Sequence, residues 1–256
     1  MPGFGDVSVS IGDDHVAVVE IHRPPDNHFD VALIGDLASA LEMLESTTDC
    51  RAVVLASEGK HFCAGASFGE HGAGDGGNGR HLYDEALRVF ANGLPMVACV
   101  QGAAIGGGLG LALAADFRVG APEARLSANF AKLGFHHGFG TTVTLPAVVG
   151  QQRAAELLLT GKRIDGEEGL RIGLLDRLAP LGDVRAEAHR FATEIAACGP
   201  LATKSIRRTM RAGLVERIRS ATDHEKAEQA LLATTRDFAE GVRAMAERRP
   251  PVFEGR

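Results

Sequence analysis

The alternation of apolar and polar positions divides the first part of the chain into short elements. Apolar residues recur at every second position in Val7–Ile11 and run together in His15–Ile21, around a Gly-Asp-Asp turn, which predicts a hairpin. Leucines at helical spacing predict a helix over Phe29–Glu45, with Asp30 as its N-cap. The uninterrupted apolar run Ala52–Ala56 is typical of a strand that is buried on both faces.

The pattern changes along the chain from mixed elements to helices alone. A helix is predicted over His81–Asn92, and short strands over Phe117–Val119 and Arg125–Ser127, with one last strand at Leu174–Leu178. The remaining predicted helices are Thr141–Val149, Gln151–Leu159, Asp165–Arg171, Val184–Ala197, Leu201–Ala212, Leu214–Ala233 and Thr235–Arg248. This order predicts an α/β core over residues 1–198, followed by a helical region over 199–256.

The stretch from Val97 to Asp116 combines an apolar strand, a turn with three consecutive glycines (Gly106 to Gly108) and a small apolar helix. Backbone N–H groups at such a turn lack helical partners and can hold a phosphate, a carboxylate, or a carbonyl oxygen that becomes an anion. A similar unit joins the strand Val53–Leu55 to the loop Phe62–Ser67. Two parallel strands would bring both loops to one edge of a sheet. The glycines are equally compatible with close helix–strand packing.

Composition limits the classes of function. The net charge of −6 argues against general nucleic-acid binding, and no apolar run is long enough to span a bilayer. The four cysteines are scattered, which predicts neither a zinc site nor a disulfide framework. The first residues lack the pattern of a signal peptide, so we expect a cytoplasmic protein with reduced thiols.

Common nucleotide and hydrolase motifs are missing. There is no G-x-x-x-x-G-K-[ST], no G-x-S-x-G, and the glycine run lacks a clean dinucleotide-binding register. Instead, a colinear set of motifs over essentially the whole chain resembles the enoyl-CoA hydratase/isomerase (crotonase) superfamily. The motifs are Phe62–Ser67, Gln101–Gly108, Asp116–Val119, Leu159–Ile164, Gly169–Leu175 and Arg249–Arg256.

The resemblance implies the ClpP/crotonase fold, an α/β spiral of ββα units with a C-terminal helical trimerisation region. It implies an acyl-CoA thioester as substrate, with coenzyme A as part of the substrate and no separate cofactor, and a homotrimer or a dimer of trimers. It also implies an oxyanion hole, which by position falls on the N–H groups of Ala64 and Gly107. Binding residues implied by position are Arg23, Cys63, Ala64, Ala66, Ser67, Ile105, Gly106, Gly107, Asn129, Phe130 and Leu133.

The chain departs from the family where a hydratase keeps two carboxylates. The matching positions here are Gly110 and Phe130, so an ordinary two-glutamate hydration mechanism is not expected. His136 and His137 stand in a loop where some family members place a catalytic carboxylate, at a position matching Gly138. A neutral imidazole can move a proton in either direction, and we favour His137 slightly over His136 as the catalytic group. The alternative is that both histidines only cap a helix or bond within the loop.

Other charged groups have competing interpretations. The glycine-rich stretch 70–80 could form a lid that supplies Glu70, His71, Asp75 or His81, although a solvated loop is the plainer alternative. No metal site is predicted, because His71, His81, His136 and His137 lack ligand spacing. Lys204, Arg207, Arg208 and Arg211 share one helix face, which predicts a solvated face, or contact with the CoA phosphates. Phe253 is interpreted as a packing residue, although the family resemblance also places it near the adenine.

Two functions follow. The first is an acyl-CoA enzyme that stabilises a thioester enolate and carries out isomerisation, hydrolysis or ring cleavage. The second, motivated by the missing carboxylates, is an acyl-CoA-binding protein without turnover.

Overall fold

A six-stranded sheet forms the centre of the molecule, in a computed structural model that describes residues 3–66 and 80–256. The strand order is β1-β2-β3-β4-β6-β8. The strands are β1 (Val7–Ile11), β2 (Val16–Ile21), β3 (Ala52–Ser57), β4 (Met96–Val100), β6 (Phe117–Gly120) and β8 (Arg177–Leu178). The β1–β2 hairpin is antiparallel, and every other neighbouring pair is parallel. A separate parallel pair joins β5 (Ala103–Ile105) to β7 (Arg125–Ser127).

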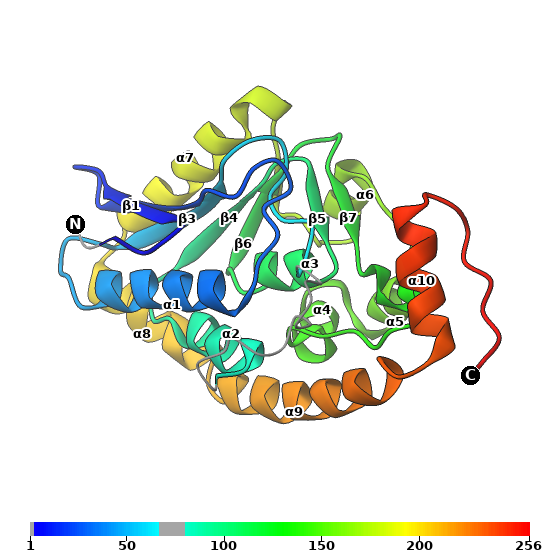
Figure 1. Cartoon of the computed structure of the whole chain (residues 1–256). Helices are drawn as coiled ribbons and strands as arrows, with labels where there is room; N and C mark the ends of the chain where they lie inside the picture. Colours follow the sequence, from blue (N-terminus) through cyan, green and yellow to red (C-terminus); the bar gives the residue numbers. More distant parts are fainter. Residues whose placement is uncertain (1–2, 67–79) are drawn as a thin grey trace.

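Helices cover both faces of the large sheet (Figure 1). They are α1 (Val31–Glu45), α2 (Leu82–Ala91), α3 (Gly107–Ala112), α4 (Thr141–Val149), α5 (Gln151–Thr160), α6 (Gly166–Arg171), α7 (Val184–Ala196), α8 (Pro200–Met210), α9 (Leu214–Leu232) and α10 (Arg236–Ala246). Two short 3₁₀ helices are η1 (Asn129–Leu133) and η2 (Leu181–Asp183).

The position of β3 between two helical layers explains why Ala52–Ala56 is apolar without interruption. Val53 and Leu55 belong to the large core on the side of α1 and α2, whereas Ala52 and Val54 belong to a second core that α7 covers. Successive side chains of a strand point to opposite faces, so a strand between two helical layers needs apolar residues at every position. The predicted buried strand is confirmed.

Most predicted elements are present with small shifts at their ends. Asp30 caps α1 as predicted, since its Oδ1 accepts a hydrogen bond from Leu33 N–H at 2.9 Å. The strand predicted over Leu174–Leu178 is reduced to β8, because Leu174 and Leu175 N–H donate to Gly169 O and continue the turn after α6. Two elements were not predicted: β5, which directly precedes the glycine run, and η1, whose Asn129 lies near Gly106 in the folded chain.

The C-terminal helices fold back onto the same chain. Helix α9 packs against α2 and α4, and α10 packs against η1 (Figure 1). Residues 199–256 therefore pack around the loop 134–140, through Asp237, Gln229 and Ile218, while their predicted role in trimerisation stays a prediction. In the described part of the chain, no helix is both long and apolar enough to cross a membrane.

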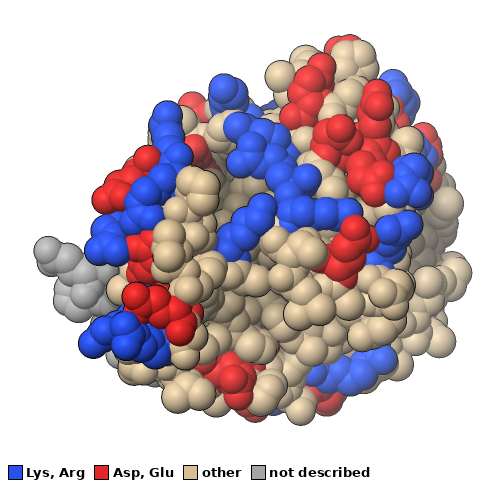
Figure 2. Space-filling view, turned by 90° about the vertical axis from the view of Figure 1, so that its right-hand side faces the viewer, with Lys and Arg blue, Asp and Glu red and all other residues tan. Residues whose placement is uncertain are grey.

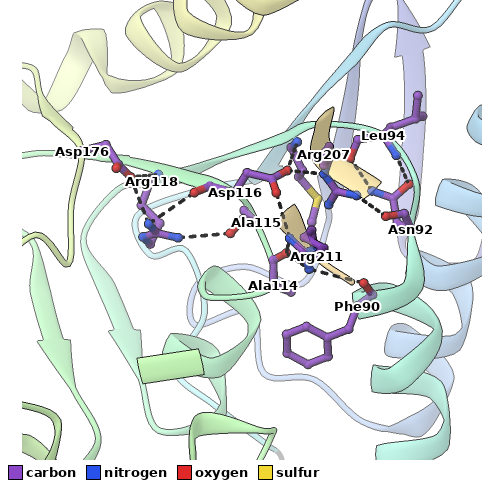
Figure 3. A network of polar contacts seen from close by, with 11 residues as sticks. Phe90, Asn92, Leu94, Ala114, Ala115, Asp116, Arg118, Asp176, Arg207 and Arg211 are labelled. Atoms are coloured by element: carbon purple, nitrogen blue, oxygen red, sulfur yellow. Dashed lines mark hydrogen bonds and ion pairs between the residues drawn. The ribbon is translucent and has the colours of Figure 1, made fainter. Parts of the chain in front are cut away.

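The basic face predicted on α8 is solvated only in part: Arg208 is exposed and Lys204 is half-buried, whereas the side chains of Arg207 and of Arg211 at the C-cap are largely buried. Arg207 Nε and Arg211 Nη1 lie 2.8 and 2.9 Å from the two carboxylate oxygens of Asp116, which follows α3 (Figure 3). The exposed fractions of the arginine side chains are 10% and 17%. Both arginines hold α8 against the core through Asp116 and through the backbone carbonyls of Asn92 and Phe90, and Arg207 Nη2 is buried without a hydrogen-bond partner among the described residues.

Candidate functional site

Two loops meet at the carboxyl ends of β3 and β4. Cys63 N–H donates to Ala103 O at 3.0 Å, and Ile105 N–H donates to Cys63 O at 3.0 Å. A Cβ added to Gly65 would lie 3.0 Å from Ile105 O and 3.8 Å from Gly107 N. The prediction that the two loops emerge at one edge of the sheet is confirmed. The carboxyl edge of parallel strands is also where ligands of α/β proteins bind.

Backbone N–H groups at this junction differ in whether they are already used. Gly106 N–H donates to Ser127 O at 2.7 Å, and Ala64 N–H donates to Asp26 O at 2.9 Å. Within residues 3–66 and 80–256, neither Gly107 N–H nor Ala66 N–H has a hydrogen-bond partner. The Ala64 half of the predicted oxyanion hole is therefore engaged elsewhere, and Ala66 offers a free donor two residues later.

The three glycines are required both by packing and by backbone geometry. A Cβ on Gly107 would lie 2.6 Å from the Phe29 ring, and a Cβ on Gly108 would lie 2.1 Å from Cys63 O. Gly106 has a φ of 56°, in the region that favours glycine. The packing interpretation of the run therefore holds, and the close approach that it allows also presents the Gly107 N–H at the loop junction.

An aromatic side chain fills the space next to the first missing carboxylate. Gly110 lies in α3, and a Cβ there would be 2.7 Å from Phe139 Cβ. Phe139 is buried and has a φ of 61°, so the backbone is bent to bring its ring into this space. At the second position, Phe130 is also buried, and its ring lies near Gly106. Both places that would carry acid–base groups in a hydratase are apolar here.

The histidine pair forms a stacked unit in the loop before α4. The rings of His136 and His137 are 4.2 Å apart with an interplanar angle of 24°, and His224 of α9 approaches His136 edge-on. Burial, and then the neighbouring His136 and His224, lower the pKa of His137 to about 4. His137 is therefore a neutral imidazole at pH 7, available as a proton acceptor.

Helix α9 supplies polar partners to this loop. These partners were not predicted from the sequence. Glu225 is fully buried and accepts hydrogen bonds from Gly140 N–H and from the N–H and hydroxyl of Thr142. The Thr142 hydroxyl oxygen lies 2.9 Å from His137 Nε2. No local sequence signal joins residues 142 and 225, because the contact depends on how α9 packs on α4.

A second polar chain fixes the same loop from α2. The Tyr83 hydroxyl donates to Gln229 Oε1 at 2.7 Å, and Gln229 Nε2 donates to His136 O at 3.0 Å. A Cβ on Gly138 would lie 2.0 Å from the Tyr83 oxygen. Tyr83 thus takes the space beside Gly138, where some family members are expected to carry a carboxylate. Burial and the charge of Glu225 raise the pKa of Tyr83, which keeps the phenol protonated.

A cavity of about 450 Å³ opens beside the histidine pair. Its apolar lining includes Phe130, Phe135, Pro146, Ala154, Leu158 and Leu232, and its polar lining includes His136, His137 and Thr142. Phe130 links this cavity to the glycine run, because it lines the cavity and its ring would lie 3.7 Å from a Cβ on Gly106. Neither Ala66 nor Gly107 belongs to the lining. An apolar space of this kind fits an acyl chain.

The other predicted residues are distributed around this centre. Asn129 Oδ1 would lie 3.1 Å from a Cβ on Gly106, and Leu133 is buried in η1. Cys63 is fully buried, and burial raises the pKa of its thiol to about 12, so it is not a nucleophile. Arg23 is paired with Asp6 and Asp30, at 2.6 and 2.9 Å. His81 caps α2 by accepting a hydrogen bond from Tyr83 N–H.

Some predictions lie outside this centre or outside the described residues. Ser67, Glu70, His71 and Asp75 are not among the described residues. Phe253 is partly exposed in the terminal segment, which folds back on α10 through Val252 N–H and Glu240. Figure 2 shows the side of the molecule on which α10 and the C-terminus lie, where basic and acidic side chains interleave. In this segment Arg249 pairs with Glu240, and Arg256 pairs with Glu254.

Comparisons with known proteins show the family of the chain. A family model described as "Enoyl-CoA hydratase/isomerase" matches residues 12–256. A Thermus thermophilus protein, provisionally named an enoyl-CoA hydratase, is 37% identical over 96% of this chain and 100% of its own. An enoyl-CoA isomerase/hydratase of Zymoseptoria tritici is 32% identical over 94% of this chain and 84% of its own.

Solved structures show the same architecture. An enoyl-CoA hydratase/isomerase from Pseudoalteromonas atlantica superposes with a TM-score of 0.88 at 28% identity, covering 98% of this chain and 100% of that chain. An enoyl-CoA hydratase from Mycobacterium avium subsp. paratuberculosis gives 0.85 at 27% identity, covering 98% and 99%. The predicted crotonase fold is confirmed.

Proposed function

Because the chain belongs to the enoyl-CoA hydratase/isomerase family, we propose that it forms a thioester enolate by a mechanism that uses a histidine in place of the two carboxylates. The observation that carries the proposal is that apolar groups stand where a hydratase has carboxylates, while a histidine lies nearby. Apolar groups fill both carboxylate positions, at Gly110 with Phe139 and at Phe130, while a neutral His137 borders the cavity that Phe130 also lines.

The proposed oxyanion hole consists of Gly107 N–H and Ala66 N–H. Both donors are free among the described residues, and they come from the two loops that Cys63 and Ala104 hold together. When a proton leaves the α-carbon, negative charge moves to the thioester oxygen, and fixed N–H groups stabilise it without reorganisation. Each such donor contributes on the order of 3 kcal/mol to lowering the barrier.

His137 is the proposed base. A group with a pKa of about 4 is unprotonated at pH 7 and can accept the α-proton, although it is a weaker base than an ordinary imidazole. Its imidazole then carries a positive charge beside the enolate and can return the proton to another carbon of the acyl chain. One group that takes and returns a proton is sufficient for moving a double bond.

Isomerisation fits the site better than hydration does. The cavity lining is dominated by apolar residues such as Phe130, Phe135, Pro146 and Leu158, which suit an acyl chain. Hydration would need a second acid–base group, which neither Gly110 nor Phe130 supplies. We therefore propose isomerisation of an unsaturated acyl-CoA as the reaction.

A panel of acyl-CoAs tests this function. We would incubate the protein with 2-enoyl-, 3-enoyl-, 3-hydroxy- and β-diketo-acyl-CoAs of four to ten carbons and follow the products by chromatography and mass spectrometry. The expected result is interconversion of 2-enoyl and 3-enoyl thioesters with no change in mass. Gain or loss of water as the main reaction would contradict the proposed isomerisation.

The second candidate function, acyl-CoA binding without turnover, is favoured by the loss of both carboxylates. It shares the hole and the cavity with the first but needs no base. Tight binding across the panel, without any product and without exchange of the α-protons, would support binding alone and reject the enzyme proposal.

A further inference from the structure

Glu225, Thr142 and His137 form a continuous chain of hydrogen bonds from the buried face of α9 to the cavity. Thr142 Oγ1 lies 2.6 Å from Glu225 Oε1 and 2.9 Å from His137 Nε2. Glu225 is 0% exposed, whereas Thr142 is exposed at the start of α4 and borders the cavity together with His137. The chain therefore runs from a buried carboxylate outward to the imidazole.

Capping explains only part of this arrangement. The residue before α4 is Gly140, which has no side chain to cap the helix, and Glu225 instead accepts the N–H groups of Gly140 and Thr142 at 2.9 and 3.2 Å. Those two bonds satisfy the helix start. The third bond, from the Thr142 hydroxyl, is not needed for capping, and it is the one that leads on to His137.

The direction of the hydrogen bonds follows from the bond to Glu225. Glu225 Oε1 accepts the hydrogen bond of the Thr142 hydroxyl, so the Thr142 O–H points at Glu225. The Thr142 oxygen is then left as an acceptor toward the imidazole, and His137 Nε2 must carry the proton that fills this bond. In a neutral ring, Nδ1 is then the unprotonated nitrogen. Among the described residues, no hydrogen bond to His137 Nδ1 is present.

We infer that Thr142 and Glu225 are positioning residues, which lock His137 as its Nε2-protonated tautomer and present Nδ1 as the base. This rests on the proposed function only for the role of the base, because the tautomer is a property of the free protein. In the reaction, the C–H electron pair moves toward the thioester oxygen and the proton binds Nδ1. The imidazolium keeps its Nε2–H bond to Thr142, and Glu225 lies one hydroxyl away from the new charge.

The first test reads the tautomer directly. Protein labelled with ¹⁵N-histidine gives long-range ¹H–¹⁵N correlations in which protonated and bare ring nitrogens have separate shifts, and the His137 signals are those lost in His137→Gln. The expected spectrum at pH 7 has Nε2 protonated and Nδ1 bare in the wild type and in Thr142→Ser. Thr142→Val, which keeps both backbone bonds to Glu225, is expected to give a mixture of tautomers.

The second test reads the consequence for proton transfer. We expect Thr142→Val to slow exchange of the α-protons of butyryl-CoA for deuterium by roughly 10- to 100-fold in kcat with little change in KM, and Thr142→Ser to restore it. Thr209→Val, which alters an exposed helical threonine on α8, is the matched control and should leave the rate unchanged. Thermal unfolding verifies that each variant is folded. If Thr142→Val does not fold, Thr142→Ala is used in its place.

The outcomes separate this inference from the function that it refines. A wild-type His137 protonated at Nδ1, or a tautomer unaffected by loss of the Thr142 hydroxyl, would overturn the inference whatever the activity. Full exchange activity in His137→Gln would instead reject His137 as the base while leaving the tautomer result in place.

Discussion

Two carboxylates of this molecule are held in opposite ways. Asp116 is paired with Arg207 and Arg211, so its charge is balanced by two cations from α8 (Figure 3). Glu225 is fully buried, and its partners among the described residues are two backbone N–H groups and one hydroxyl, with no cation. A balanced charge fastens one element to another. A charge satisfied only by neutral donors can still act on a neighbouring group, here His137 through Thr142.

The largest expected effect is the loss of stability when each of these two carboxylates is replaced by its amide. Asp116→Asn leaves two largely buried arginines without their counter-ion, so we expect it to lower the free energy of unfolding by about 3–5 kcal/mol. Glu225→Gln leaves no unpaired cation and should cost less, about 1–3 kcal/mol. Urea unfolding of both variants measures the difference, and equal losses would contradict the distinction between the two sites.

A smaller effect is expected where Phe139 fills the space beside Gly110. Gly110→Ala places a methyl group 2.7 Å from Phe139 Cβ, so we expect a loss of about 1–3 kcal/mol despite the better helix propensity of alanine. Phe139→Gly removes both the obstacle and the strained φ. The loss in Gly110→Ala/Phe139→Gly should therefore be less than the sum of the two single losses in urea unfolding. Simple additivity would show that the two residues do not share this space.

A further effect is expected on the pH dependence of stability. The pKa of His137 is lowered to about 4 in the folded protein, so between pH 6.5 and 4 the unfolded chain binds more protons at this residue than the native chain. The contribution of neutral His137 to the free energy of unfolding is therefore fully present above pH 6.5 and is lost as the pH falls toward 4. We expect the urea midpoint of the wild type to fall more steeply over this window than that of His137→Gln. Parallel profiles would contradict the lowered pKa.

The fold could be predicted from the sequence because its signals are local or colinear. The hairpin, the Asp30 cap and the helices of the C-terminal half follow from periodicity and turn residues, and the order of motifs indicated the family. The short strand β5 was missed because Ala103–Ile105 is three residues long and lies between glycines. Only its pairing with β7 in the folded structure identifies this segment as a strand.

The candidate site was predictable only in part, because side-chain partnerships cross the chain. Gly107, Phe130 and the histidine pair could be placed by motif. Ala64 and Ala66 both stand in one small-residue loop, and only the bond from Ala64 N–H to Asp26 O separates them. Glu225 looked like one more polar residue of an amphipathic helix, since its partner Thr142 is more than 80 residues away in the sequence.

The most direct test of the central claim, that a histidine replaces the two carboxylates, is α-proton exchange of butyryl-CoA in D₂O followed by mass spectrometry. Exchange reports enolate formation whatever the natural acyl group is. The account predicts that the wild type incorporates α-deuterium, that His137→Gln exchanges roughly 100-fold or more slowly, and that His136→Gln retains most of the rate. Wild-type exchange that survives in His137→Gln, or no exchange by the wild type at all, would contradict it.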